Sequence, residues 1–385
     1  MKRLLLCVFL IALFTENYGQ NVKVSDYEVP VSKAKILRLS GSYNFSQSST
    51  DSTTTVNANN ASATLLFRYF YSSLPFAYFV DVDATGGKVF DNYNHDISIR
   101  PSVRKYFDEK TDFFGFGSLF LRHANTFKQI QSDLLLGGGY GRYINATTLA
   151  KAVRIEEHLI REKVISGYMP KETMIAIANI IEREDEYRGV YGDTYEQRWY
   201  EDIEKEILKS GKMVGEHLGA IGILRMQQVL KNINERVNER FYGWDVTLGV
   251  LFNLSTSDKS DTRSPALSIG GRYSHPISWS SQINSFLNVS TPFDSTFFKD
   301  VRGELGIDYI YELSNKINFI GGYRLNYTKP NVGDGYADHF LNGSFIFYME
   351  NSINLGINAT LASYGLSTAK RTDFRTSVTL QYNLF

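Results

Sequence analysis

The sequence has very little cysteine and no surplus of either charge. Cys7 is the single cysteine, so the chain cannot form an internal disulfide bond, and 41 Lys and Arg residues balance 41 Asp and Glu residues. A general nucleic-acid binder needs an excess of basic residues to neutralise phosphates. With 43% hydrophobic residues the chain also differs from disordered and collagen-like proteins. We therefore expect neither a disulfide-stapled domain nor a nucleic-acid partner.

The sequence also lacks the common catalytic and metal-binding motifs. It contains no His-Glu-x-x-His, no Gly-x-Ser-x-Gly and no cysteine pair. Six histidines are scattered along the chain, and His95, close to Asp91 and Asp96, is the one local candidate for a catalytic group. The sequence therefore predicts no metal ion, no cofactor and no catalytic residue, and hydrolysis at His95 is kept as a minor hypothesis.

Long apolar runs are missing except at the N-terminus. Lys2 and Arg3 precede an uncharged apolar run over residues 4–14, and Gly19 offers a cleavage position in the polar stretch that follows. This layout is typical of a secretory signal peptide, which we assign to residues 1–19. The run is too short to span a bilayer, and no later run is long enough for a transmembrane helix. If the protein crosses a membrane, it does so with strands.

Most of the remaining chain alternates between apolar and polar residues. Trp244, Val246 and Leu248, for example, alternate with Asp245 and Thr247. Period-two alternation is typical of a strand with one apolar face. We count about fourteen such segments, each near the length of a tilted transmembrane strand. They begin near Ile36, Ala61, Phe76, Asp96, Phe113, Gln131, Trp244, Pro265, Gln282, Val301, Ile317, Asp338, Ile353 and Thr372.

The connections between these segments alternate in length. Short ones, such as residues 72–75, alternate with longer polar ones, such as residues 47–60 and 86–95. Short turns on one side and long loops on the other are typical of an outer-membrane barrel with its turns in the periplasm. A soluble β-sandwich would alternate too, but the Tyr and Phe residues near strand ends favour a lipid interface. We predict an antiparallel transmembrane β-barrel of about fourteen strands.

The polar face of such a barrel would line its lumen. Mixed charges there either border a water-filled pore or pair across it and close it, and the sequence leaves both possibilities open. The candidates for lining the lumen are Arg38, Arg68, Asp81, Asp83, Arg100, Arg104, Asp245, Arg272, Asp300, Arg302, Glu304, Asp308 and Arg324.

Residues 146–242 break the strand period. Apolar residues such as Trp199, Ile203 and Ile207 recur at intervals of three and four, which predicts about four amphipathic helices. We expect Thr147 or Thr148 to cap the first helix. The up-and-down order places this insertion in the periplasm, as either a plug for the barrel or a docking module for a periplasmic protein or glycan. The predicted domains are then a periplasmic segment over 20–34, strands 1–6 over 35–145, the insertion, and strands 7–14 over 243–385.

The signal followed by Gln20, the alternating segments and a final strand ending in Phe385 resemble Gram-negative outer-membrane β-barrel proteins, particularly those common in the Bacteroidota. The resemblance implies a place in the cell outer membrane, in contact with its lipid. It also implies recognition by the barrel-assembly machinery through a C-terminal signal, here Tyr382 and Phe385. It implies no particular substrate.

Two main functional hypotheses follow. The charged inward face favours a channel for small solutes with a plug or gate. The size of the insertion favours an assembly or secretion component whose periplasmic helical domain binds a partner. An outer-membrane hydrolase is the third candidate, because the barrel fold itself hosts many functions.

Overall fold

The computed structural model describes residues 20–27, 31–50, 53–73, 76–108, 111–233, 235–260, 262–349, 353–365 and 370–383. The predicted signal peptide and Phe385 lie outside the described residues. Tyr382 lies in the last strand, where its backbone pairs with Leu39 of the first.

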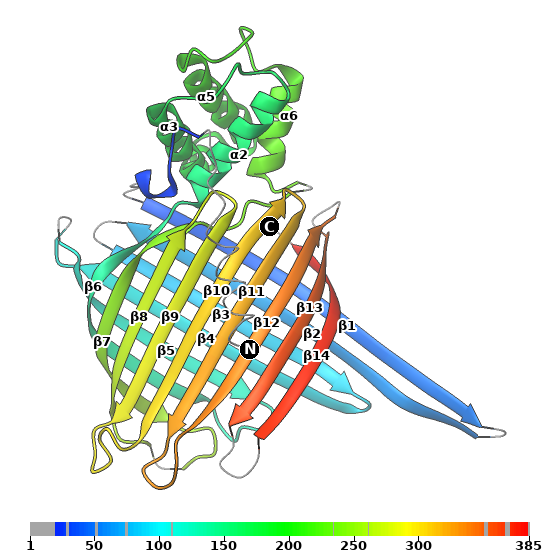
Figure 1. Ribbon diagram of the computed structural model, residues 1–385, viewed down its shortest axis with the longest axis vertical. Helices are drawn as coiled ribbons and strands as arrows, with labels where there is room; N and C mark the ends of the chain where they lie inside the picture. Colours follow the sequence, from blue (N-terminus) through cyan, green and yellow to red (C-terminus); the bar gives the residue numbers. More distant parts are fainter. Residues whose placement is uncertain are drawn as a thin grey trace.

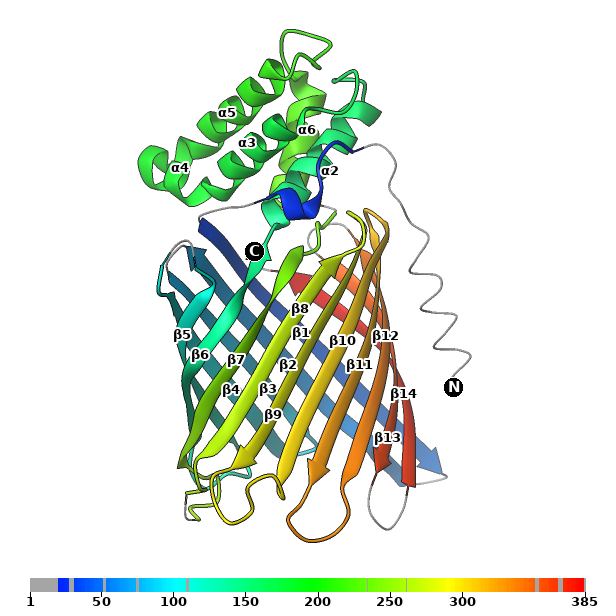
Figure 2. The ribbon, with the colours of Figure 1, turned by 60° about the vertical axis from the view of Figure 1, so that its left-hand side comes forward.

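Fourteen antiparallel strands in the described part of the chain form one closed barrel (Figures 1 and 2). Each strand pairs with its neighbours in sequence, and β1 closes the sheet on β14. The predicted fold class and strand number are therefore confirmed. The strands are β1 (Val31–Thr50), β2 (Thr53–Ser73), β3 (Phe76–Val89), β4 (Asn92–Tyr106), β5 (Phe113–Ala124), β6 (Gln131–Asn145), β7 (Phe241–Ser255), β8 (Ala266–Pro276), β9 (Ser281–Pro292), β10 (Val301–Ser314), β11 (Ile317–Lys329), β12 (Tyr336–Tyr348), β13 (Ile353–Gly365) and β14 (Lys370–Asn383).

Two of the predicted long loops are wrong. The backbones of β1 and β2 stay paired from Gln47 opposite Val56 to Thr50 opposite Thr53, so the hairpin projects beyond the barrel wall (Figure 1). Residues 86–95 are likewise paired, with Gly86 opposite His95. Residues 47–60 contain no glycine or proline, and their threonines favour extended backbone, so nothing there ends the ladder before a tight turn.

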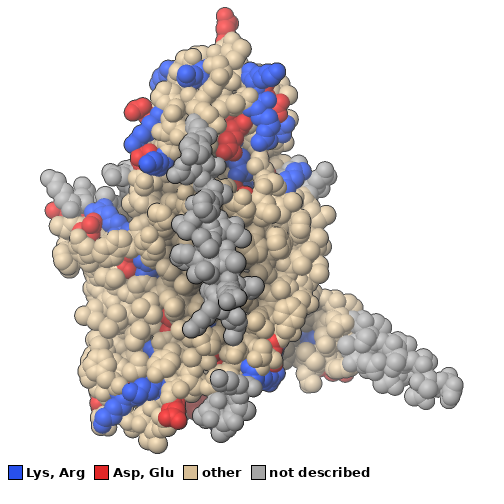
Figure 3. All heavy atoms as spheres, viewed as in Figure 1, with Lys and Arg blue, Asp and Glu red and all other residues tan. Residues whose placement is uncertain are grey.

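Large apolar side chains cover the outer face of the barrel. On β7, Trp244, Val246 and Leu248 are 46%, 48% and 57% exposed, whereas Asp245 between them is 1% exposed. In Figure 3 charged side chains gather mainly near the ends of the wall and on the helical part, and the wall between them is mostly uncharged. An exposed apolar surface of this extent is typical of contact with a membrane or with another protein. Its other members include Leu39, Ile97, Ile99, Val103, Leu136, Ile269, Leu287, Ile307, Leu341, Ile357, Val378 and Leu380.

Between β6 and β7 the chain forms a helical domain that lies over one end of the barrel (Figure 2). Its first helix is not capped by a threonine. Instead, Oδ1 of Asn145 accepts hydrogen bonds from the backbone N–H of Thr147 at 2.9 Å and from its hydroxyl at 2.5 Å, so the last strand residue satisfies the first turn. The elements of the domain are α2 (Thr147–Arg161), α3 (Lys171–Glu182), α4 (Glu184–Tyr191), η2 (Gly192–Thr194), α5 (Tyr195–Lys209) and α6 (Gly219–Leu230).

The N-terminal segment packs into this helical domain. Val22, Val24 and Tyr27, which flank or belong to the short helix η1 (Val24–Asp26), are buried in the same core as Trp199 of α5. The backbone carbonyl of Tyr27 also accepts a hydrogen bond from the Tyr242 hydroxyl at 2.6 Å. Residues 22–27 therefore tie the helical domain to the start of β7, and the first strand begins only at residue 31.

The helical core contains a carboxyl group that, among the described residues, forms no ion pair. Glu156 of α2 is 1% exposed and accepts a hydrogen bond from the backbone N–H of Met169 at 2.6 Å. Burial raises the pKa of Glu156 to about 7, the nearby charge of Glu157 adds to the rise, and the Met169 N–H opposes it. Because the folded pKa lies above the ordinary value of 4.5, the folded domain takes up a proton that the unfolded chain has already released.

We therefore predict that the helical domain loses stability as the pH rises. The contribution of Glu156 is fully present below its ordinary pKa and is lost as the pH rises through about 7. Between about pH 5.5 and about pH 8 this amounts to about 2 kcal/mol. Thermal melts of the helical circular dichroism signal measure it. Glu156→Gln should remove most of the difference, whereas the exposed Glu172→Gln should retain it; an equal dependence in all three proteins would contradict the prediction.

Candidate functional site in the barrel lumen

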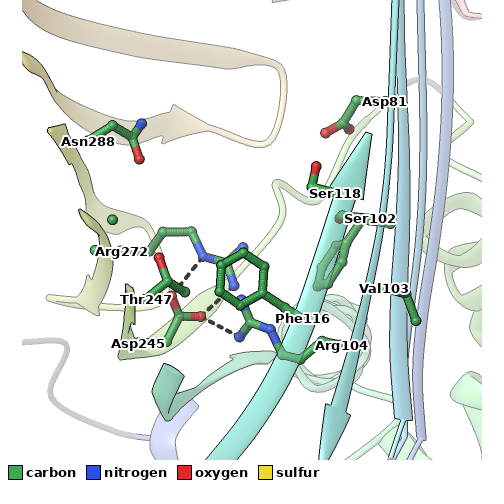
Figure 4. Close-up of a pocket in the computed structure, with 13 residues that line it drawn as sticks. Asp81, Ser102, Val103, Arg104, Phe116, Ser118, Asp245, Thr247, Arg272 and Asn288 are labelled. Carbon is green, nitrogen blue, oxygen red and sulfur yellow. Dashed lines mark hydrogen bonds and ion pairs between the residues drawn. The ribbon is translucent and has the colours of Figure 1, made fainter. Parts of the chain in front are cut away.

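Three of the predicted lumen residues meet at one point on the inner wall (Figure 4). Asp245 of β7 accepts hydrogen bonds from Nε and Nη2 of Arg272 on β8 at 3.2 and 2.5 Å, and from Nη1 of Arg104 at 2.7 Å. Arg104 comes from β4, which β5 and β6 separate from β7. Its side chain therefore reaches along the inside of the wall. Two arginines and one aspartate leave this cluster with a net positive charge.

Glycines on the inner face of β6 make room for this reach. A Cβ atom on Gly139 would lie 2.4 Å from the ring of Phe114 and 2.5 Å from the carbonyl oxygen of Val246. Phe114 occupies the space and is fully buried, and the guanidinium of Arg104 stacks 3.9 Å from its ring centre. Bare backbone on β6 thus allows an aromatic ring from β5 to support an arginine from β4.

A cavity of about 230 Å³ opens above the cluster. In Figure 4 Arg104, Asp245 and Arg272 gather in its lower part, with Asp81 and Ser118 set apart from them on one side and Asn288 on the other. The lining comprises Phe79, Asp81, Ser102, Val103, Arg104, Phe116, Ser118, Asp245, Thr247, Gly270, Gly271, Arg272 and Asn288. The lumen at this height is therefore neither empty nor fully packed.

The other predicted lumen residues form smaller groups. Arg324 donates to both carboxylate oxygens of Asp308 on the neighbouring strand, at 2.9 and 2.7 Å. Arg68 lies 3.8 Å from Asp81, also on a neighbouring strand. Arg100 stacks over a phenylalanine ring, at 5.1 Å from the centre of Phe120.

The remaining five predicted residues are not brought together. In the described part of the chain, Asp83, Asp300, Arg302 and Glu304 take part in no ion pair, and the buried Nε of Arg38 has no hydrogen-bond partner. Asp300 is also not on a strand, because it lies in the loop that precedes β10.

A second charged cluster joins the helical domain to the barrel. Glu312, near the end of β10, accepts hydrogen bonds from Arg154 of α2 and, at 2.6 Å, from Nη2 of Arg240. The side chain of Glu312 is 3% exposed and that of Arg240 is fully buried. Buried charges of this kind require partners, so loss of one member leaves the others uncompensated.

This cluster extends across several strands. Asn238 donates from Nδ2 to Glu312 at 2.9 Å and accepts from Asn318 of β11 at the same distance. Asn318 also donates to the Tyr348 hydroxyl of β12 at 2.8 Å. The segment from residue 235 to 240, which leads from the helices into β7, therefore reaches the inner ends of β10 and β11, and Asn318 links it to β12. We call this segment the mouth segment.

The mouth segment is also fixed to α2. His158 hydrogen-bonds through Nε2 to Oε1 of Glu235 at 2.8 Å, and Nη1 of Arg154 lies 3.5 Å from the same carboxylate. Burial alone would raise the pKa of Glu235, but His158 and Arg154 outweigh it and hold that pKa below its usual value. Burial would likewise lower the pKa of Arg154, yet Glu312, Glu157 and Glu235 raise it. Both groups are therefore held in their charged forms.

Sequence reasoning missed the residues of this second cluster. Glu312 continues the inward phase of Glu304 and Asp308 along β10, so the alternation could have indicated it. Arg154 and Arg240 carried no such signal, because their partner lies on a distant strand.

The acidic neighbours predicted for His95 do not contact it. Nε2 of His95 lies 3.0 Å from Nδ1 of His123, whereas Asp96 accepts from Arg122 at 2.9 and 2.5 Å. Successive side chains on a strand point to opposite faces, which separates His95 from Asp96. No group of three or more potential metal ligands occurs among the described residues. In the same part of the chain, no helix is both long and apolar enough to cross a membrane.

Comparisons with known proteins indicate only distant likeness. No protein-family model and no curated protein matches the sequence. A solved structure described as a bacterial polysaccharide outer membrane secretin has 10% identity and a TM-score of 0.29, covering 93% of this chain and 100% of its own. The CymD monoaromatic hydrocarbon channel has 10% identity and a TM-score of 0.30, covering 94% and 90%. OpdQ of Pseudomonas aeruginosa has 8% identity and a TM-score of 0.31, covering 92% and 97%.

The first of these is described as an outer-membrane protein and the second as a channel, and no narrower family emerges. They are too distant to transfer a substrate or an activity to this chain.

We predict that Gly139→Ala destabilises the barrel. The added methyl group would meet both a buried ring and a backbone oxygen at distances that require movement, which costs on the order of 1–3 kcal/mol. Samples are heated to stepwise higher temperatures and run on a detergent gel. The temperature at which the fast-migrating folded form disappears measures the loss of stability. Gly138→Ala is the matched control, because its Cβ would meet only the carbonyl oxygen of Phe114 at 3.5 Å. Equal behaviour of the two variants would show that the inner face of β6 tolerates side chains.

Proposed function

We propose that the protein is an outer-membrane β-barrel that transports small polar solutes, with the helical domain and mouth segment closing its periplasmic end. The observation that carries this proposal is the lumen itself: charged and hydroxyl-bearing side chains line a cavity inside a wall whose outer face is apolar. A polar cavity inside a lipid-facing wall is the arrangement by which barrels pass hydrophilic solutes.

The outer wall supports the membrane location. Aromatic side chains are prominent toward the helical end, where Phe113, Tyr140, Trp244 and Tyr273 are 38–57% exposed, as expected of an interfacial girdle. Contact with outer-membrane lipid and insertion by the barrel-assembly machinery belong to the same proposal.

The connections support the orientation. At the helical end β8–β9 and β10–β11 are joined by short turns, whereas β7–β8, β9–β10 and β11–β12 are joined by longer loops at the far end. Barrels of this class keep their short turns in the periplasm. The helical domain would then lie in the periplasm.

The mouth segment supports closure. It runs from α6 to β7 and contacts β10 and β11, where Asn238 and Arg240 both donate to Glu312 and Asn318 donates to Asn238. A closed resting state needs this kind of fixed contact, because an unattached segment would leave the pore open part of the time. Opening would require the Glu312 contacts to break.

We predict that Glu312→Gln increases conductance in planar bilayers. Removing the charge leaves Arg154 and Arg240 poorly compensated, at a cost of about 3 kcal/mol to the closed arrangement. Single-channel recording should show rare openings for the natural protein and frequent openings for the variant.

Glu304→Gln is the matched control. Glu304 has the same inward phase on the same strand and, among the described residues, no ion pair. It should behave as the natural protein does. A second variant, in which a short flexible linker replaces residues 148–239, should conduct continuously. If neither Glu312→Gln nor this deletion variant conducts while both show folded-barrel gel mobility, the transport proposal is wrong.

The helical domain also supports a second candidate function, the docking of a periplasmic protein or glycan. Ile221 and Leu224 lie three residues apart on α6 and are each 50% exposed, and Val190 and Val214 are 74% and 67% exposed. Because residues three apart share one face of a helix, Ile221 and Leu224 form an adjacent apolar pair, and this pair is the candidate contact surface.

We predict that a photo-crosslinking residue at position 221 captures one discrete periplasmic partner in intact cells. The same residue at position 205, where the natural Lys205 side chain is 64% exposed and pairs with Asp202, should not capture it. Gel electrophoresis after irradiation measures the difference. Identical products from both positions, or none from position 221, would count against docking through α6.

A further inference from the structure

The arginine pair of the lumen cluster keeps hydrogen-bond donors in reserve. Arg104 uses only Nη1 on Asp245, and Arg272 uses Nε and Nη2. The other nitrogens, Nε and Nη2 of Arg104 and Nη1 of Arg272, have no hydrogen-bond partner among the described residues. Asp245 supplies one negative charge against two positive ones. The cluster is thus short of one anionic acceptor.

The donors are accessible from the cavity, whereas the carboxylate is not. The side chain of Arg272 is 34% exposed and that of Arg104 is 11% exposed, but that of Asp245 is only 2% exposed. A solute that enters the cavity therefore meets guanidinium edges first. Because protein surrounds much of each guanidinium group, its attraction for an anion is less screened than at an open surface.

Aromatic rings hold both guanidinium groups in place. Arg104 stacks at 3.9 Å from the centre of Phe114, and Arg272 at 4.5 Å from the centre of Tyr143. Groups fixed before the ligand arrives lose little rotamer freedom on binding. A planar fork of N–H donors also matches the two oxygens of a carboxylate.

The remainder of the cavity offers neutral polar groups. Ser102, Ser118 and Thr247 contribute hydroxyls, and Asn288 contributes an amide. These groups exchange hydrogen bonds readily with the hydroxyls of a solute. The cavity volume, about 230 Å³, is more than ten times the roughly 10–15 Å³ that one water molecule needs. The space therefore suits a small organic molecule.

We propose that this cavity binds a small hydroxylated carboxylate. Its carboxylate would accept from the unbonded N–H groups of Arg104 and Arg272, and its hydroxyls would face Ser102, Ser118, Thr247 and Asn288. Asp81 lies apart from the two arginines in the cavity lining. Arg68, at 3.8 Å and so beyond hydrogen-bond distance, offsets its charge only in part. Asp81 therefore still repels an anion and favours binding at the arginine end. This inference rests on the proposed function, because it identifies the class of solute that a transporting lumen would select.

Isothermal titration of the full-length protein in detergent tests the inference. Gluconate is the probe, glucose is its neutral counterpart, and inorganic phosphate tests whether another oxyanion suffices. We expect gluconate to bind at least about tenfold more tightly than either. Equal binding of glucose would overturn the role of the charge. Tighter binding of phosphate would overturn the assignment to a carboxylate.

Three variants separate recognition from folding. Arg272→Gln should weaken gluconate binding at least about tenfold, and Asp81→Asn should strengthen it about threefold or more by removing a repulsive charge. Arg324→Gln is the matched control: it also removes one inward arginine, but one that is already neutralised by Asp308. It should leave binding within about twofold of the natural value. Equal loss in Arg272→Gln and Arg324→Gln, or weaker binding in Asp81→Asn, would overturn the inference.

The titration and the conductance measurements fail independently. If gluconate binds but Glu312→Gln does not conduct, the transport proposal is contradicted and the binding site is supported. Conductance without gluconate binding would keep the channel and remove the binding site.

Discussion

Closure of the backbone hydrogen-bond ladder is the constraint on which the rest of this structure depends. A sheet with free edges leaves N–H and C=O groups unpaired, and only a closed barrel removes both edges. Here the closing pair, β1 with β14, runs from Arg38 to Gly41 in the described part of the chain, and β1 and β2 continue far beyond Gly41 as a hairpin. Once the sheet is closed, every strand has an inner and an outer face, and the period-two alternation assigns each side chain to one of them.

The inner face of a closed barrel allows contacts between side chains that a flat sheet would keep apart. Charged side chains that would each face water on an open sheet are brought within reach of strands several places away. Arg104 reaches Asp245 in this way. Its side chain crosses β6, where Gly139 has no side chain, and stacks on the ring of Phe114. The neutral balance of the whole chain therefore does not hold at the Arg104–Asp245–Arg272 cluster, where two arginines share one aspartate.

The helical domain is attached to one end of the barrel. Its core buries the residues of the N-terminal segment, and its contact with the barrel combines buried ion pairs with apolar packing of Tyr242 and Trp279. Such a contact is strongly dependent on each partner, because a buried charge without its counter-charge is costly. In the proposed function, such an ionic contact would hold the mouth segment firmly and still be released by the loss of a single interaction.

The alternation of apolar and polar residues by itself indicated the strand number, the outward face and the interruption by helices, because these follow from local periodicity. The closed barrel also required the alternating lengths of the connections and the aromatic residues near strand ends. The phase of each strand also indicated Arg104, Asp245 and Arg272 as inward residues. Only the tertiary structure decided that these three meet, that Asp308 pairs with Arg324, and that Arg154 and Arg240 of the insertion share Glu312. Those contacts depend on the order of the strands around the barrel and on where backbone without side chains leaves room. Neither property can be inferred from the identity of the residues that form the contact.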